Sequence, residues 1–453
     1  MRGWLQEARA QLALAVPVTA VQVGLMAMAV VDLIMVGHRS AGDLAAVSVG
    51  NAFAFGVMSF GMGALLVLDP LIAQAVGAGD RAAVGRGLQR GVALALLLSV
   101  PVALLIAPAH SVFAAVGIDP DVAPVAGGYA LTNIPSVFAF YLFVVLRHTL
   151  QAMHRLRPIV AVILVGNAAN ALLNWVLVYG HLGAPELGAV GSGWATSICR
   201  WGMALGLLAM AWPVLGGHLR PLRREALRAA PLLKMLGLGL PIGVQLVLEA
   251  GGFAAVSLLM GRLGETEAAA HQIAINLASV SFMVPLGISM AAAVRVGREV
   301  GAGHPRRARR AARVALVGGA GVMALFGCVF LALPGPLASL YTEDAAVAGL
   351  AVVFIRMAAA FQVFDGVQVV SAGVLRGVGD TRFPMVTFLL GFWCLGLPLG
   401  GWLTFGTDVG PRGLYLGLGV GLFTAAVVLA LRIRVRLSRV LERLDVEAPA
   451  GVQ

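Results

Sequence analysis

Three carboxylates lie inside long apolar stretches of this chain, where an ionised group is costly. Asp32 stands in VVDLIMVG, Glu249 in QLVLEAGGF and Asp365 in FQVFDGVQVV. A carboxylate in such surroundings is stabilised when it takes up a proton or binds a cation such as Na⁺. The three acids are therefore candidate sites for an exchanged ion. The alternative is that each is hydrated at a membrane edge, which fits Asp32 and Asp365 better than Glu249.

The sequence offers no obvious basic partner for these acids. Its only lysine is Lys234, and Arg356 precedes Asp365 by about two and a half helical turns, too far for a local pair. We therefore expect the acids to lack a fixed counter-charge.

Neutral oxygen-bearing side chains accompany the first acid. Asn170 and Asn174 are four residues apart, so they share one face of a predicted helix. Together with Asp32 and Thr196 they would form a hard oxygen site suited to Na⁺ or to a relayed proton. The alternative role of each amide is a hydrogen bond between helices, which is common in membrane bundles.

Two glutamines stand beside the other acids. Gln245 lies one turn before Glu249, and Gln368 lies about one turn after Asp365. The same two roles, ion site or interhelical hydrogen bond, are open for these amides.

The elements that carry these residues are predicted to be membrane-spanning helices. Of all residues 60% are hydrophobic and 12% are charged, against about a quarter charged in soluble proteins. The apolar runs are roughly 20 or more residues long, which is enough to cross a bilayer as a helix. They also lack the alternation of apolar and polar residues that is typical of barrel strands. The sequence predicts an all-α integral membrane protein with twelve spans, at residues 12–36, 45–74, 88–110, 123–148, 156–180, 188–212, 232–260, 269–298, 311–333, 345–370, 382–405 and 412–435.

The chain is an internal duplication with an offset of 224 residues. Gly77-Ala78-Gly79 returns as Gly301-Ala302-Gly303, and Gly63 returns as Gly287. Because each half has an even number of spans, the two repeats are parallel, as in transporters that rock one half against the other. We expect an N-lobe at 1–212, a cytoplasmic linker at 213–231 and a C-lobe with a cytoplasmic tail at 232–453.

The formal net charge of +11 does not indicate nucleic-acid binding. Most Lys and Arg residues fall in alternate loops, which places both termini in the cytoplasm by the positive-inside rule and the basic loops against lipid headgroups. The three cysteines and eight histidines show no metal-ligand spacing, and no nucleophile or metal constellation predicts an enzyme.

Several motifs resemble those of the multidrug and toxic compound extrusion (MATE) transporters, in their NorM-like branch. They are VDLIMVG, NAANALLNWVLVYG, GSGWATSI, PIGVQLVLEAGGFA, GETEAAAHQIAIN and FQVFDGVQVVSAGVLRGVGDTRFP. The resemblance covers nearly the whole chain. It implies two six-helix lobes that export cationic, amphipathic compounds in exchange for Na⁺ or H⁺.

The resemblance also implies roles for individual residues. An N-lobe cation site would comprise Asp32, Asn170, Asn174 and Thr196, and a C-lobe site Glu249 and Asp365. The substrate cavity would include Gln245, Phe361, Gln368 and Asn276. Phe361 departs from the family, in which a tyrosine can occupy this position; the missing hydroxyl puts direct Na⁺ coordination in the C-lobe in doubt.

The resemblance further implies a protein of the bacterial cytoplasmic (inner) membrane whose partners are small cationic molecules and lipids. We expect it to be a monomer that needs no cofactor and binds no nucleic acid. Two other classes are open. A lipid-linked saccharide flippase has a related bundle, but basic residues would be expected in its cavity. An integral membrane enzyme or a proton-pumping subunit would need a catalytic constellation or intramembrane lysines, which the sequence does not show.

Overall fold

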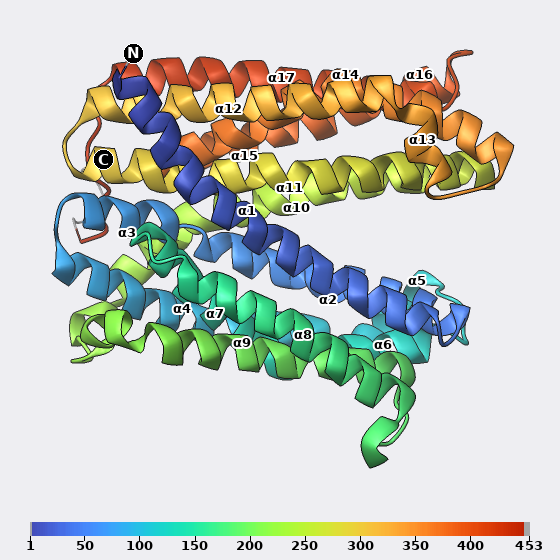
Figure 1. Ribbon diagram of the computed structural model, residues 1–453, viewed down its shortest axis with the longest axis horizontal. Coiled ribbons are helices and arrows are strands. Elements are labelled where there is room, and N and C mark those ends of the chain that lie inside the picture. The colour runs from blue at the N-terminus through green and yellow to red at the C-terminus, as the bar shows by residue number, and fades with distance from the viewer. Residues whose placement is uncertain (1, 448–453) are drawn as a thin grey trace. The chain divides into compact units, whose positions relative to one another are not determined.

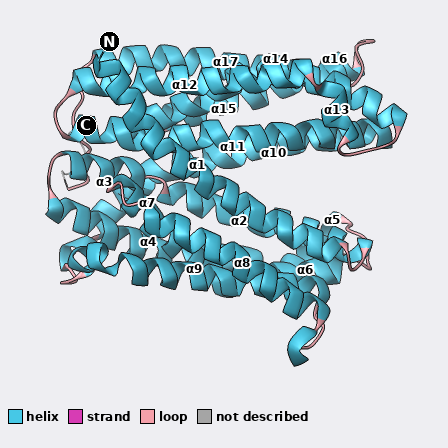
Figure 2. Ribbon diagram, viewed as in Figure 1, coloured by secondary structure: helices cyan, strands magenta, loops and turns pink. Residues whose placement is uncertain are grey.

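The computed structural model describes residues 2–447. Within this part of the chain the regular secondary structure is helical, without strands (Figure 2). Among residues 2–447, twelve helical segments are long and apolar enough to cross a membrane, and each overlaps one predicted stretch. The predicted twelve-helix, all-α fold is confirmed.

The first half of the chain forms spans 1 to 6 (Figure 1). Its helices, together with the short η segments, are α1 (Arg2–Gly37), α2 (Ala41–Leu65), α3 (Leu68–Gly77), α4 (Arg81–Ile106), α5 (Ala109–Val116), α6 (Ala123–Thr132), η1 (Ile134–Ser136), α7 (Val137–Ala152), α8 (Arg157–Tyr179), η2 (His181–Gly183) and α9 (Gly188–Leu219). The segment η3 (Arg224–Leu227) lies in the connection to the second half.

The second half repeats the pattern in spans 7 to 12. Its elements are α10 (Ala229–Leu263), α11 (Glu265–Gly301), α12 (Pro305–Ala332), α13 (Pro334–Ser339), α14 (Ala345–Gly377), α15 (Arg382–Phe388), η4 (Leu389–Gly396), α16 (Leu397–Phe405) and α17 (Arg412–Ser438). The segment η4 is a π-helix, so span 11 continues from α15 through η4 into α16.

Local sequence explains where several helices begin and end. Ser40 caps α2 by accepting a hydrogen bond from the Asp43 amide, and Asp80 caps α4 through the Ala83 amide. Helix α8 ends at Tyr179 and is capped by Gly180, whose positive φ of 73° is a conformation that glycine adopts without strain.

Burial is distributed as expected for a protein surrounded by lipid. Large apolar side chains such as Leu96, Leu104 and Val165 are more than half exposed. Polar groups including Asp32, Asn170 and Asn174 are buried. Apolar side chains that face hydrocarbon need no further cover, whereas polar groups at that depth must find partners inside the bundle.

The chain divides into two compact units whose boundaries lie within helices. One unit comprises Ala20–Gly243 with residues 445–447, and the other comprises residues 2–19 with Val244–Leu444. Helices α1 and α10 therefore each contribute residues to both units. Helix α9 continues through Pro213 to Leu219, so the non-helical connection between the halves is shorter than the linker expected at 213–231.

Candidate functional site

The four residues expected around the first acid lie together in one unit. The Asp32 carboxylate, 5% exposed on α1, accepts hydrogen bonds from three side chains. Asn170 Nδ2 and Asn174 Nδ2 on α8 donate to Asp32 Oδ1 at 2.9 and 2.7 Å, and Thr196 Oγ1 on α9 donates to Oδ2 at 2.8 Å. Three donors directed at two carboxylate oxygens stabilise the ionised form of Asp32. We call these four residues the Asp32 cluster.

The helices of this cluster approach one another where small side chains allow it. A β-carbon on Gly24 would lie 2.5 Å from Ile163, and one on Gly166 would lie 3.0 Å from Met203. Asn167 Nδ2 adds a hydrogen bond to the Gly24 carbonyl at 3.0 Å. Helix α8 is thereby held against α1 and α9, which brings Asn170 and Asn174 within reach of Asp32.

Two oxygen atoms of the Asp32 cluster have unmet bonding capacity. The side-chain oxygens Oδ1 of Asn170 and Asn174 are buried and accept no hydrogen bond within the described chain. A buried acceptor without a partner is destabilising. Rotation of either amide would turn its oxygen toward the carboxylate, and the resulting all-oxygen set fits a hard monovalent cation.

The expectation that the acids lack a fixed counter-charge needs refinement. None of the three carboxylates makes a salt bridge within residues 2–447, and Arg356 is exposed. Arg200, however, is buried and interacts electrostatically with Asp32. Arg376 is also buried and interacts electrostatically with Glu249. Sequence reasoning did not single out Arg200, although its position one turn after Thr196 was an available signal.

The second pair of acids lies in the other unit and shares one amide. Gln368 Nε2 on α14 donates to Asp365 Oδ1 at 3.0 Å and to Glu249 Oε1 on α10 at 3.2 Å. Asp365 Oδ1 and Glu249 Oε1 can therefore be no farther apart than the sum of these two hydrogen-bond distances. Asp365 is buried and Glu249 half-buried. We call these three residues the Glu249 cluster.

Close helix packing positions Asp365 in this cluster. A β-carbon on Gly366 would lie 2.9 Å from the carbonyl oxygen of Gly319 and 2.6 Å from Met323, so glycine is required where α14 contacts α12. Gln368 Oε1 is buried and accepts no hydrogen bond within the described chain, which leaves a third oxygen beside the two carboxylates.

Three other residues expected at the substrate cavity lie in different surroundings. Gln245 is buried one turn before Glu249 on α10, but it does not join the hydrogen bonds of the Glu249 cluster. Phe361 is buried with its ring 6.4 Å from that of Tyr415. Asn276 Oδ1 accepts a hydrogen bond from the Tyr341 hydroxyl at 2.9 Å, so the structure does not bring it to the acids.

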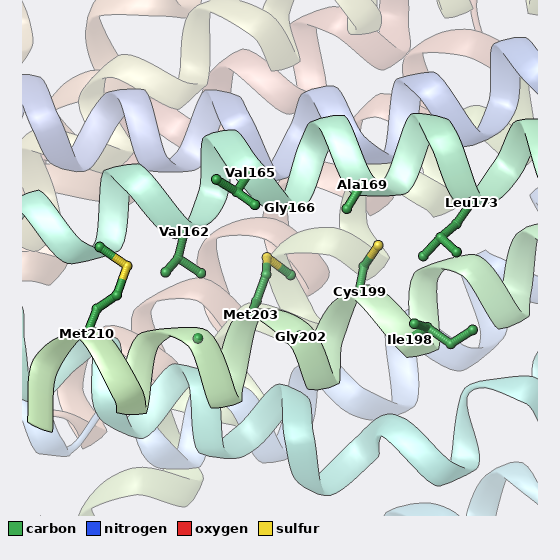
Figure 3. A pocket seen from close by; sticks show the side chains of 11 residues that line it. Val162, Val165, Gly166, Ala169, Leu173, Ile198, Cys199, Gly202, Met203 and Met210 are labelled. Atoms are coloured by element: carbon green, nitrogen blue, oxygen red, sulfur yellow. The ribbon is translucent and has the colours of Figure 1, made fainter.

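An apolar pocket of about 270 Å³ lies between α8 and α9 (Figure 3). Figure 3 shows side chains of both helices directed into it, with three sulfur atoms among them. Its residues are Val162, Val165, Gly166, Ala169, Leu173, Ile198, Cys199, Gly202, Met203, Gly206 and Met210. The pocket borders the two helices that carry Asn170, Asn174 and Thr196, but it contributes no charged group.

Comparisons with known proteins identify the family. A family model described as MatE matches residues 17–176 and 241–402, one match in each repeat. The chain is 37% identical over 455 residues to the probable multidrug resistance protein NorM of Mesorhizobium japonicum, covering 95% of this chain and 94% of that protein. It is 38% identical over 448 residues to the multidrug resistance protein MdtK of Yersinia pseudotuberculosis, covering 96% of both.

Solved structures agree with the fold. The crystal structure of the eukaryotic MATE transporter AtDTX14 matches with a TM-score of 0.87 at 24% identity, covering 95% of this chain and 96% of that chain. An outward-facing multidrug resistance MATE family transporter of the MOP superfamily also gives 0.87, at 19% identity and with the same coverage. The family consists of transporters, as the absence of a predicted enzymatic constellation led us to expect. This multi-pass membrane protein belongs to the MATE family of transporters.

Proposed function

We propose that this protein exports cationic, amphipathic compounds by alternating access, in exchange for Na⁺ or H⁺. The names of its NorM and MdtK relatives, multidrug resistance proteins, support drug export, and the buried acids favour cationic compounds. The coupling ion, which is transported cargo, binds at the acid clusters. No cofactor takes part.

The observation that carries this proposal is the shared amide of the Glu249 cluster. Glu249 and Asp365 each contact the same nitrogen of Gln368, so two acids occupy one small volume inside a membrane bundle. Two ionised carboxylates at this separation repel each other. A bound proton or Na⁺ relieves that repulsion, and release of the ion restores the repulsion. A site that alternates in this way can bind and release an exchanged ion.

The Asp32 cluster supports the same chemistry in the other unit. Its carboxylate is satisfied by neutral donors, and two further amide oxygens are available to a cation. Binding of a cation at either cluster changes the free-energy difference between the outward-open and inward-open states only if its affinity differs between them. We propose the two six-helix lobes as the parts that move.

The membrane placement follows from the distribution of charge. We propose a bacterial cytoplasmic membrane with both termini in the cytoplasm, because most Lys and Arg residues lie in the loops on that side. We also propose that one copy of the chain is sufficient for transport, since each copy contains both acid clusters.

Proteoliposomes with the purified protein test the exchange directly. We expect uptake of ethidium, a fluorescent organic cation, to be driven by an imposed Na⁺ or pH gradient, each applied separately. Asp32→Asn and Glu249→Gln should each reduce that uptake. Glu343→Gln is the control, because Glu343 is an exposed acid outside both clusters. Uptake that neither gradient drives, or that both variants retain in full, would contradict the proposal.

A further inference from the structure

Arg200 is a buried cation on α9 with neutral partners. It is 8% exposed. Its Nη1 atom donates to Asn133 Oδ1 at 2.7 Å and to Ser136 Oγ at 3.1 Å, and the guanidinium carbon lies 5.2 Å from the centre of the Phe140 ring. Within the described residues no carboxylate forms a salt bridge with it. A charge held among neutral groups and shielded from water acts on its surroundings with little screening.

Arg200 shares helix α9 with one member of the Asp32 cluster. Thr196 lies one turn before Arg200, so the two residues share a face of α9. Thr196 donates directly to Asp32 at 2.8 Å. Asp32 and Arg200 carry opposite charges, and each hydrogen-bonds to neutral side chains rather than to the other. The guanidinium is thus a counter-charge at a distance, which leaves the carboxylate oxygens to the amides and to a ligand.

Arg200 is the permanent positive charge of this region. Three ionisable side chains that interact electrostatically with Asp32 or Arg200 are Tyr129, Tyr141 and Cys199. All three are neutral in their ordinary protonation states. The carboxylate and the guanidinium therefore set the local field, and their charges are opposite.

We propose that Arg200 determines the charge selectivity of the Asp32 cluster, favouring ligands with one positive charge over dications. This inference rests on the proposed function and adds to it that the exported organic cation binds at the Asp32 cluster in exchange with the coupling ion. The Coulomb energy between Arg200 and a ligand is proportional to the ligand's charge. Arg200 therefore weakens the binding of a dication twice as much, in free energy, as that of a monocation. Ligands without net charge escape the penalty.

Ethidium and propidium form a matched pair of probes, since they share a phenanthridinium ring system and carry one and two positive charges. Equilibrium binding to the purified protein in detergent is measured for both by fluorescence anisotropy. In Arg200→Gln we expect ethidium affinity to rise about tenfold and propidium affinity about a hundredfold, as expected for a unit charge removed from a partly buried site. Arg200→Lys keeps the charge and should keep the ratio of the two affinities.

Asp32→Asn provides the opposite control. It removes a negative charge, so it should weaken propidium binding more than ethidium binding. A purely structural role of Arg200 would change both affinities by the same factor. The proposal would be overturned if the ratio of the two affinities is unchanged in Arg200→Gln. It would also be overturned if that ratio is altered in Arg200→Lys.

A second variant covers the case in which Arg200→Gln does not fold. Phe140→Glu places a negative charge beside the guanidinium and offsets its field without removing its contacts to Asn133 and Ser136. It should shift the ratio toward propidium, and Phe140→Gln should not. These measurements use no ion gradient. Loss of gradient-driven uptake would contradict the proposed function, whereas an unshifted ratio in an active exchanger would contradict this inference alone.

Discussion

Gly63 of α2 packs so closely on Gly243 of α10 that a β-carbon on Gly63 would lie 2.4 Å from the Gly243 α-carbon. The same contact recurs at the repeat offset. Gly287 of α11 packs on Thr19 of α1, where a β-carbon would lie 2.9 Å from the Thr19 backbone. Gly63 corresponds to Gly287, and Thr19 corresponds to Gly243. The duplication visible in the sequence is therefore also a duplication of helix contacts, one within each unit.

The first prediction follows from this contact. Gly63→Ala should lower the free energy of unfolding by about 1 to 3 kcal/mol, because the added methyl group meets backbone that cannot move aside independently. The thermal unfolding midpoint in detergent measures the loss. Gly237→Ala is the matched control on α10, where a β-carbon would meet nothing within 4 Å. An unchanged midpoint in Gly63→Ala would show that the helices separate at little cost.

The repeats share their backbone contacts but not their acids. At the repeat offset Asp32 corresponds to Val256, and Glu249 corresponds to Leu25. Each unit therefore carries its carboxylates at different positions of a common scaffold. The units bind cations, in our proposal, with different ligand sets and hence with different affinities.

The sequence was sufficient to predict the spans and much of the Asp32 cluster. Apolar runs and one-turn spacing determine these features locally, so Asn170 and Asn174 could be placed on one face before the fold was known. Their contact with Asp32 was a hypothesis from shared oxygen chemistry, which the family resemblance also implied, because residues 138 apart in the chain are joined only by tertiary packing.

Other features could not be predicted because they depend on tertiary partners. The π-helix η4 within span 11 has no distinct apolar period. Asn276 was assigned to the substrate cavity by motif, whereas its partner Tyr341 lies in a loop beyond α13. The significance of Arg200 depends on the break in span 4 at η1, which supplies Asn133 and Ser136 as neutral acceptors.

The second prediction concerns the shared amide of the Glu249 cluster. Gln368→Leu should weaken Na⁺ binding about tenfold, because it removes the amide oxygen beside the two carboxylates, and it should strengthen proton binding, because it removes the donor that stabilises their ionised forms. The concentration of Na⁺ or H⁺ that half-saturates ethidium exchange measures the change. The exposed Gln272 on α11 offers a control, and Gln272→Leu should leave this concentration unaltered. A Gln368→Leu protein with unaltered half-saturation would separate Gln368 from ion binding.

The third prediction concerns a buried chain of polar groups in the unit of Asp32. His148 Nδ1 lies 2.6 Å from Asp69 Oδ1, and both side chains are fully buried. Arg147 Nη2 lies 3.1 Å from His148 Nε2, and Arg147 Nη1 donates to Gln22 on α1 at 2.8 Å. Since arginine can only donate, His148 accepts at Nε2 and donates to Asp69 through Nδ1.

His148→Ala should therefore reduce the free energy of unfolding by about 3 kcal/mol, because it removes the donor to Oδ1 of the buried Asp69 carboxylate together with a buried side chain. Thermal unfolding in detergent reports it. His38→Ala serves as the control, since His38 is exposed and should change stability by less than about 0.5 kcal/mol. Equal midpoints for the two variants would mean that Asp69 is adequately satisfied by its other surroundings.

The last prediction concerns the missing hydroxyl at Phe361. Phe361 lies one turn before Asp365 on α14, so a hydroxyl at this position would be on the same helix face as the carboxylate. Phe361→Tyr adds a neutral oxygen ligand to the Glu249 cluster, and hard oxygen ligands suit Na⁺. The Na⁺ concentration that half-saturates ethidium exchange should fall by about threefold to tenfold, corresponding to one added hydrogen-bond-strength contact. The proton dependence should change less, because a proton needs a single carboxylate rather than a set of ligands.

Phe364→Tyr is the control. The ring of Phe364 packs against that of Phe423 with 5.1 Å between their centres, and a hydroxyl added there should leave the response to Na⁺ as it was. If Phe361→Tyr responds to Na⁺ as the unmodified protein does, then direct coordination by this position is not what limits Na⁺ binding at Glu249 and Asp365.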